Sequence, residues 1–282
     1  MVVRCNSDWQ IKKSAMANLL SLPRKSVSPL LVACSARYQS DTAVAQYCDA
    51  HYGPDKFGVA NFSKRIAQLC IMAQEGRPQR RALDLGCSVG RTTFELATRF
   101  DQATGIDYSD RFIEIARHLK RHGKIGYRLR EDGELFSNHQ VTLADFDLDM
   151  ITSRVTFSQG DVRCLAAGSG DYDLVLAANL IDRLPDPGQF LSEIHHRLVI
   201  DGLLVIASPY DWIERFTPRK RWLCHHLYCA GIPRTSLEGL SKKLTKHFTP
   251  VAQPQEMEFV IRDTARTFRH NISQVTLWRR IC

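Results

Sequence analysis

An acidic residue, Asp84, stands on an apolar run directly before a glycine turn in the stretch ALDLGCSVG, residues 82–90. Gly86 and Gly90 suit such a turn, because glycine adopts positive φ and lets a ligand approach the backbone. Dinucleotide sites use the spacing Gly-x-Gly-x-x-Gly and rest a pyrophosphate on the following helix N-terminus. Here the spacing is Gly-x-x-x-Gly, and a carboxylate beside a phosphate would cost about 1 to 4 kcal/mol. The turn is therefore predicted to bind a ligand without phosphate.

Two more carboxylates end the next apolar runs, Asp107 in GID and Asp161 in QGDV. Asp107 is placed to accept from ribose hydroxyls, and Asp161 can accept from an adenine amino group while Val162 packs on the ring. Each acid alone also fits a structural turn or a helix cap. Together they suit S-adenosylmethionine, which carries a sulfonium and an ammonium group and no phosphate, with S-adenosylhomocysteine as product. The predicted cofactor contacts are Asp84, Gly86, Cys87, Gly90, Asp107, Tyr108, Asp161, Val162 and Asn179.

The elements that must position these acids alternate along the chain. Apolar runs typical of strands occupy 81–86, 103–107, 154–159, 172–178 and 202–207, with helix-period segments between most of them. This alternation predicts a parallel sheet with helices on both faces, because parallel neighbours need long crossovers. It also brings the three acids to one edge, beyond the carboxyl ends of the strands.

Other segments complete the predicted fold. A helical pattern from Tyr47 to Gln74 is broken at 53–58, a helix is expected near 110–121, and a polar insertion fills 123–153. The β-rich runs at 258–262 and 274–278 predict a terminal antiparallel hairpin. The predicted fold class is α/β, a doubly wound, mostly parallel seven-stranded sheet with an antiparallel C-terminal hairpin, as in Rossmann-like proteins.

Charge and composition limit the classes of partner. The chain has 282 residues and a formal charge of +8, of which +5 falls in residues 1–40, with six Lys/Arg and one Asp. We therefore predict a flexible basic extension over 1–40 and one domain over 41–282. The balanced domain gives no reason to expect nucleic acid, and the basic cluster at 219–221 is interpreted as a solvated face. The extension weakly suits a mitochondrial transit peptide, but a cytoplasmic location is expected.

Neither a membrane span nor a metal is expected. The longest apolar runs, such as 203–207, fall far short of the roughly 20 residues that a span requires. The nine cysteines include no Cys-x-x-Cys pair, and the cluster at 224–229 has no zinc spacing. A reducing compartment fits this cysteine usage.

The residues after the fourth strand, AANLIDRL at 177–184, should face the transferring methyl group. An Asn-Pro-Pro-Tyr type of motif, which serves exocyclic amines of nucleobases, is absent there. Asn179 and Asp182 could orient a small polar acceptor as catalytic residues, and Arg183 could bind its carboxylate. Arg183 could equally form a surface ion pair.

From about residue 80 to 280 the chain resembles class I S-adenosylmethionine-dependent methyltransferases. Over about 45–280 it resembles more closely the C-terminal methyltransferase domain of ovothiol biosynthesis enzymes. The segments that carry this second resemblance are HYG at 51–53, FGVANF at 57–62, LDLGCSVGR at 83–91, AANLIDRL at 177–184, SPYDW at 208–212 and FVIRDTAR at 259–266.

The ovothiol resemblance implies N-methylation of the imidazole of 4-mercaptohistidine, also called 5-thiohistidine. Family members usually join this domain to an iron-dependent sulfoxide synthase, whose His-x-x-x-His-x-Glu type of site is missing here. The resemblance therefore implies methylation alone, with a separate sulfoxide synthase protein as partner, or a fragment of a longer enzyme. Asn179 or Asp182 would fix the ring tautomer. Candidate acceptor-binding residues are His51, Tyr52, Arg183, Tyr210, Trp212 and Arg262.

Two alternatives stay open. A methyltransferase acting on another small molecule, or on RNA, could share every cofactor residue. A subunit that binds S-adenosylmethionine without catalysis would also keep the acids at 84, 107 and 161.

Overall fold

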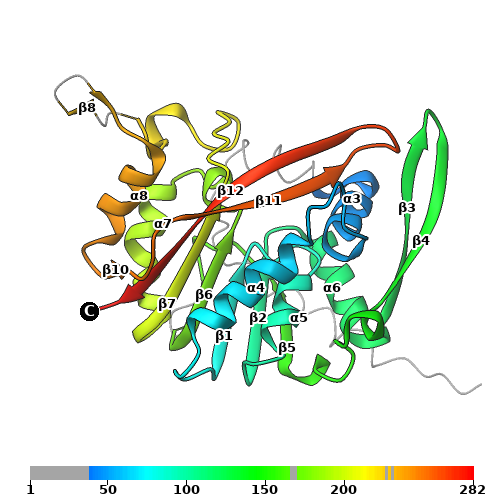
Figure 1. The fold of residues 1–282 in the computed structure, drawn as a ribbon, viewed down its shortest axis with the longest axis horizontal. Helices are drawn as coiled ribbons and strands as arrows, with labels where there is room; N and C mark the ends of the chain where they lie inside the picture. The colour runs from blue at the N-terminus through cyan, green and yellow to red at the C-terminus, as the bar shows by residue number, and fades with distance from the viewer. Residues whose placement is uncertain (1–37, 166–169, 226–227, 230–231) are drawn as a thin grey trace, which may run out of the picture.

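The computed structural model describes residues 38–165, 170–225, 228–229 and 232–282. Its centre is a mixed sheet in the order β10-β12-β7-β6-β1-β2-β5, with β11 also paired to β12 (Figure 1). The strands from β5 to β7 are parallel, and β12 runs antiparallel to β7. The strands are β1 (Arg81–Leu85), β2 (Gln102–Asp107), β5 (Val155–Gln159), β6 (Tyr172–Ala178), β7 (Leu198–Ser208), β10 (Phe248–Pro250), β11 (Gln255–Arg262) and β12 (Phe268–Arg280).

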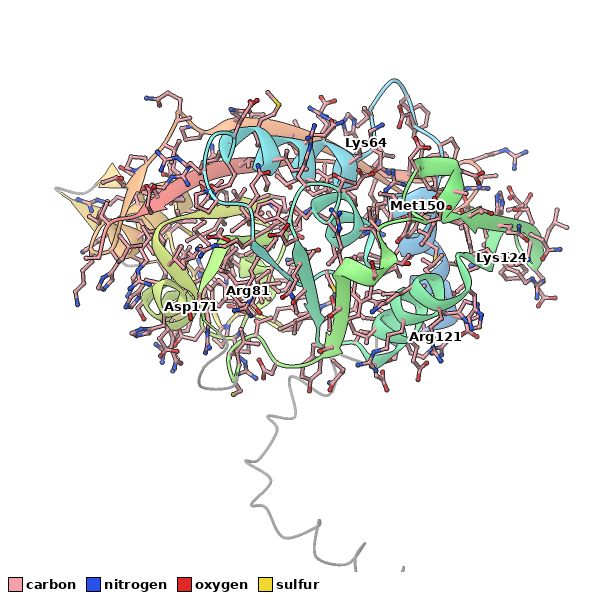
Figure 2. The ribbon with its side chains drawn as sticks, turned by 90° about the horizontal axis from the view of Figure 1, so that it is seen from below. Lys64, Arg81, Arg121, Lys124, Met150 and Asp171 are labelled. Carbon is pink, nitrogen blue, oxygen red and sulfur yellow. The ribbon has the colours of Figure 1, made fainter. Side chains whose placement is uncertain are left out.

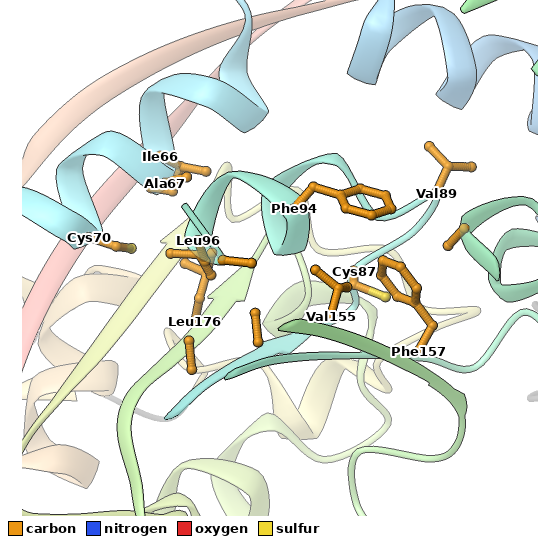
Figure 3. Packing of buried hydrophobic residues seen from close by; sticks show 14 of the residues in the cluster. Ile66, Ala67, Cys70, Cys87, Val89, Phe94, Leu96, Val155, Phe157 and Leu176 are labelled. Atoms are coloured by element: carbon orange, nitrogen blue, oxygen red, sulfur yellow. The ribbon is translucent and has the colours of Figure 1, made fainter. Parts of the chain in front are cut away.

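Helices cover both faces of the sheet, which is why its central strands are apolar on both sides. On one face, residues of α4 (Phe62–Ala73), α5 (Arg91–Leu96) and α6 (Asp110–His122) share a core with Leu174 and Leu176. Figure 3 shows Ile66, Ala67 and Cys70 of α4 close to Leu176 of β6. The opposite core holds residues of α7 (Pro187–Glu193) and α8 (Ser236–Leu244).

The predicted fold class is confirmed, and so are the five predicted strands and the terminal hairpin. The sheet has eight strands in place of seven, because β10 and β11 pair with different parts of the long strand β12. β7 begins at Leu198, four residues before the predicted run. Its pairing with β6 shifts register between Tyr172 and Leu174, so the strand continues across Asp201 and Gly202.

The polar insertion forms a hairpin that the sequence analysis did not assign. Its strands are β3 (Lys124–Asp132) and β4 (Leu135–Thr142), and two short 3-10 turns follow at Leu143–Phe146 and Thr152–Arg154. β3 packs against α6 and against α3 (Asp41–Tyr52). Figure 1 shows the hairpin standing beside α3 at one end of the molecule, and in Figure 2 Arg121 and Lys124 lie on that side.

The predicted extension over 1–40 lies largely outside the described residues. Its last residues, from Tyr38 onward, contact the domain: the Ser109 hydroxyl donates to the Tyr38 carbonyl at 3.1 Å. A separate two-stranded ladder joins β8 (Tyr228–Cys229) to β9 (Ile232–Pro233). Among the described helices, none has the length and apolar character needed to cross a membrane.

Candidate active site

A cavity of about 360 Å³ opens at the carboxyl ends of the parallel strands. Its volume is in the range of small-molecule sites, and its position is where doubly wound sheets bind ligands. The predicted site residues that line it are His51, Asp84, Gly86, Cys87, Asp107, Tyr108, Asp161, Val162, Asn179, Asp182 and Arg183.

The turn between β1 and α5 has the backbone that its glycines predicted. Gly86 and Gly90 have φ of 77° and 89°, and Ser88 between them has φ of 50°. A Cβ at Gly90 would lie 2.6 Å from Cζ of Phe157. Gly90 is not among the cavity-lining residues, so its part is to let the turn pack against β5.

Asp84 lies at the floor of the cavity and is only 2% exposed. Its Oδ2 accepts a hydrogen bond of 2.7 Å from the Thr93 hydroxyl. Burial raises the pKa of Asp84 to about 7, although the Thr93 hydrogen bond opposes the shift. No positively charged side chain is paired with this carboxylate among the described residues.

Asp107 is the second acid in the cavity wall, and its side chain is partly buried. Its two oxygens accept backbone N–H groups of Ser109 at 2.8 Å and Ser88 at 2.9 Å. Burial raises the pKa of Asp107 to about 6, against the effect of these hydrogen bonds. β1 and β2 are neighbours in the sheet, so the two acids lie at adjacent strand ends. Together they form a region that a cationic ligand would stabilise.

Unlike Asp84 and Asp107, Asp161 is paired with a positively charged side chain. Arg163 donates to it through Nε at 2.9 Å and Nη2 at 2.5 Å, which neutralises its charge locally. A ligand amino group would have to share this carboxylate with Arg163. Val162 beside it lines the cavity, and its packing on an adenine ring stays a prediction.

The segment after β6 is held mainly by contacts within the protein. Asn179 has φ of 52°, and its Oδ1 accepts from the Ser273 hydroxyl at 2.6 Å. Asp182 is fully buried and pairs with Arg183 at 2.8 Å, and burial raises its pKa. Arg183 also donates to the carbonyl and carboxylate of Asp211. Asp182 and Arg183 thus form an internal ion pair at the cavity wall.

Four predicted acceptor contacts are not among the residues that line the cavity, and each has another partner. Tyr52 is buried and donates to the Val89 carbonyl at 3.0 Å. Tyr210 packs in the core beside α8 and lies 3.4 Å from Gln274 Oε1. The Trp212 indole donates to Ser236 at 2.8 Å, and Arg262 pairs with Glu131 of β3 at 2.5 Å.

Further residues, which the sequence does not predict as site residues, line the cavity. Gln46 and Tyr47 come from α3, Asn61 and Ser63 from the start of α4, and Arg269 from β12. Tyr47 and His51 are four residues apart and therefore share a helix face, which was a signal available in the sequence. Arg269 gave no comparable signal, because only the sheet pairing of the hairpin brings it to the cavity.

The described residues contain no group of three or more His, Cys, Asp or Glu arranged to hold a metal ion. Part of the cysteine and histidine cluster at 224–229 falls outside that description.

A family model described as a methyltransferase domain matches residues 83–206. Magnesium-protoporphyrin O-methyltransferase of Rhodobacter capsulatus is 28% identical over 145 residues, covering 49% of this chain and 53% of that protein. Ajmaline N-methyltransferase of Rauvolfia serpentina is 27% identical over 130 residues, covering 46% of this chain and 36% of that protein. The match thus spans about half or less of each of these curated relatives.

The fold has solved counterparts. The crystal structure of magnesium protoporphyrin IX methyltransferase from Synechocystis PCC 6803 with bound SAM matches with a TM-score of 0.52 at 13% identity, covering 90% of this chain and 99% of that one. Three observations point to the same kind of domain: the sheet order, the glycine turn after β1, and the match of residues 83–206 to the methyltransferase family model. Residues 83–206 are therefore similar to a methyltransferase domain, and the chain has the class I methyltransferase fold.

Proposed function

We propose that this protein transfers a methyl group from S-adenosylmethionine to an imidazole nitrogen of 4-mercaptohistidine. The observation that carries the proposal is that segments of the ovothiol resemblance, far apart in the sequence, border the same cavity as the acids Asp84 and Asp107. His51, Asn61, Asn179 and Phe259 come from four of these segments and all line it. A cavity of about 360 Å³ suits a small acceptor beside the cofactor.

The residues at the floor fit the cofactor. Asp84 is buried, Asp107 is partly buried, and neither has a cationic partner among the described residues. Desolvation raises the pKa of both carboxyls, which favours their neutral forms in the cofactor-free site. A sulfonium and an ammonium group would favour the ionised carboxylates. When bound, S-adenosylmethionine supplies an electrophilic methyl group. The chain's own residues have to hold the acceptor in line with it at roughly 3 to 3.5 Å.

The acceptor end of the cavity offers Arg269 as a carboxylate ligand. Its Nε and Nη2 are held by Asp263, which also accepts from Gln46 of α3 at 2.8 Å. No hydrogen bond from Nη1 of Arg269 to another described residue is present. Arg183, by contrast, already donates through both terminal nitrogens to carboxylates and carbonyls of the protein. Arg269 is therefore better placed to bind the amino-acid end of the acceptor.

Another acceptor is the second candidate, favoured by the relatives, which include both O- and N-methyltransferases. We further propose that the sulfur–histidine bond of the acceptor is made elsewhere, by a separate sulfoxide synthase protein.

The test is methyl transfer from labelled S-adenosylmethionine to thiohistidine, histidine, a phenol and bulk RNA, with mass spectrometry of the products. The expected result is N-methylated thiohistidine together with S-adenosylhomocysteine. Preferential transfer to another acceptor would reject the thiohistidine proposal while leaving the methyltransferase domain in place. Calorimetric binding of the cofactor without transfer to any acceptor would favour a non-catalytic subunit.

A further inference from the structure

His51 is an imidazole in the cavity wall that no charged side chain neutralises. It lies in the last turn of α3, and its Nδ1 is 3.3 Å from the hydroxyl of Ser63 on α4. Ser63 is itself 3% exposed. Most ionised groups of the wall have charged partners: Lys56 pairs with Asp49, and Arg269 pairs with Asp263. His51 is thus an uncharged polar group presented to the cavity.

Asn61 holds the backbone of His51 in place by connecting α3 to α4. Asn61 donates through Nδ2 to the His51 carbonyl at 3.0 Å, and its Oδ1 accepts from the Lys64 N–H at the start of α4. One asparagine therefore joins the end of α3 to the beginning of α4. This junction is what brings the His51 ring and the Ser63 hydroxyl together.

The surroundings keep the ring neutral. Burial and, to a smaller extent, the nearby Arg91 guanidinium lower the pKa of His51 to about 3. The Arg91 Nη1 lies 3.5 Å from the His51 carbonyl, and Arg91 pairs with Glu95 at 2.6 Å. A neutral imidazole carries one N–H and one lone pair. When Nδ1–H donates to Ser63, Nε2 has its lone pair free for a ligand.

We infer that His51 is a positioning residue that accepts the N–H of the acceptor's imidazole and so selects which ring nitrogen receives the methyl group. This inference rests on the proposed function. The attacked nitrogen needs its lone pair, so the ring proton must be on the other nitrogen and needs an acceptor. Asn179 and Asp182, the sequence-based candidates, already have Ser273 and Arg183 as partners. His51 gives this hydrogen bond without bringing a charge into the cavity.

The test compares His51→Gln, His51→Asn and His51→Phe by the ratio of the two N-methyl regioisomers, read by NMR. The Gln amide oxygen can replace Nε2, whereas the Asn amide is expected to replace only Nδ1. We expect His51→Gln to keep one regioisomer. His51→Asn and His51→Phe should give mixtures, with kcat/KM for the acceptor reduced about tenfold, the size of one hydrogen bond.

Cofactor affinity, measured by calorimetry, should stay within about twofold in all three variants, because His51 is assigned to the acceptor. A single unchanged regioisomer at the wild-type rate from His51→Asn would overturn the inference, and this holds even when His51→Phe fails to fold. Failure of the proposed function is seen separately, since the wild-type protein would then methylate no imidazole acceptor.

Discussion

Asp84 and Asp107 show how single residues prepare the site for a cation. Asp84 is buried and Asp107 is partly buried, and both accept hydrogen bonds from neutral groups only, namely a hydroxyl for Asp84 and backbone N–H groups for Asp107. Such partners offset part of the cost of burying a carboxylate, and a cationic ligand offsets more. We therefore expect the ionisation of these two acids to be coupled to cofactor binding.

The first prediction concerns the pH dependence of this coupling. Because burial raises the pKa of Asp84 to about 7, S-adenosylmethionine must displace a proton below that pH, and its affinity should fall by up to about tenfold per pH unit. Asp84→Asn should bind more weakly at pH 8 and show a flatter profile between pH 6 and 8. Calorimetry at three pH values in buffers of equal ionic strength checks this; a wild-type affinity independent of pH would contradict it.

The same shift has a consequence for stability, and its sign follows from proton binding. The folded protein keeps a proton on Asp84 between about pH 4 and 7 that the unfolded chain has lost. The free energy of unfolding of the cofactor-free protein should therefore decrease as pH rises through this window. Asp84→Asn, which removes the buried charge, should raise the melting temperature relative to the wild type at pH 8 but not at pH 4.

The second prediction separates Arg183 from Arg269. Arg183→Ala leaves Asp182, which is fully buried, without its counter-charge, so we expect a loss of about 3 kcal/mol in the free energy of unfolding. Arg269→Ala removes a half-exposed side chain and should change stability by less than about 0.5 kcal/mol. It should instead raise KM for the acceptor about tenfold. Denaturant melts and acceptor kinetics on both variants check this; an unchanged KM in Arg269→Ala would reject its binding role.

The residues differ in how far the sequence alone revealed them. The positions of Asp84 and Asp107 were predictable, because an acid at the carboxyl end of a parallel strand in a doubly wound sheet lies at the edge where ligands bind. For Arg183 the sequence left acceptor binding and an ion pair equally open, because it does not show that Asp211 from a distant loop is its partner. Arg269 was missed for the same reason, since antiparallel pairing places it opposite Ile261.

At the scale of elements, the connection from β1 to α5 depends on two glycines with different tasks. Gly86 lines the cavity, whereas Gly90 is the N-cap residue of α5 and lies against Phe157 of β5 and Ala116 of α6. The strands and this turn were predictable because buried parallel strands are continuous apolar runs and glycines mark the turn. The β3–β4 hairpin was not, because the apolar residues Ile125, Tyr127 and Leu129 alternate with charged and small ones in a segment that reads as polar.

The third prediction tests the packing of Gly90. Gly90→Ala combines a left-handed φ of 89° with a Cβ 2.6 Å from Phe157, so we expect a loss of about 2 to 4 kcal/mol in the free energy of unfolding. Gly123→Ala is the matched control, because its φ of 70° is also left-handed but its Cβ would meet nothing within 4 Å. It should cost about 1 kcal/mol. Equal losses in the two variants, measured by urea denaturation, would show that the contact with Phe157 is unimportant.

At the scale of the whole molecule, two hairpins from different parts of the chain meet beside α3. The turn between β11 and β12 reaches the β3–β4 hairpin (Figure 1), where the Ala265 N–H donates to the Glu131 carbonyl and Arg262 pairs with the Glu131 carboxylate. α3 packs against both β3 and β11. Because α3 carries Tyr47 and His51, these hairpins support the cavity wall where we propose that the acceptor binds.

The fourth prediction follows from this arrangement. Glu131→Gln removes the charge from a pair whose side chains are only 14% and 25% exposed, and it should loosen the contact that keeps the two hairpins together. We expect faster amide hydrogen exchange in α3 and a KM for the acceptor raised about three- to fivefold, since small displacements of a binding wall weaken alignment. Cofactor affinity should not change, because Asp84 and Asp107 lie on the sheet.

Asp132→Asn is the control on the neighbouring residue: its pair with Arg266 spans 3.6 Å with side chains 76% and 81% exposed, and exposed pairs contribute little. If both variants leave α3 exchange and acceptor KM unchanged, the hairpins are independent of the acceptor site.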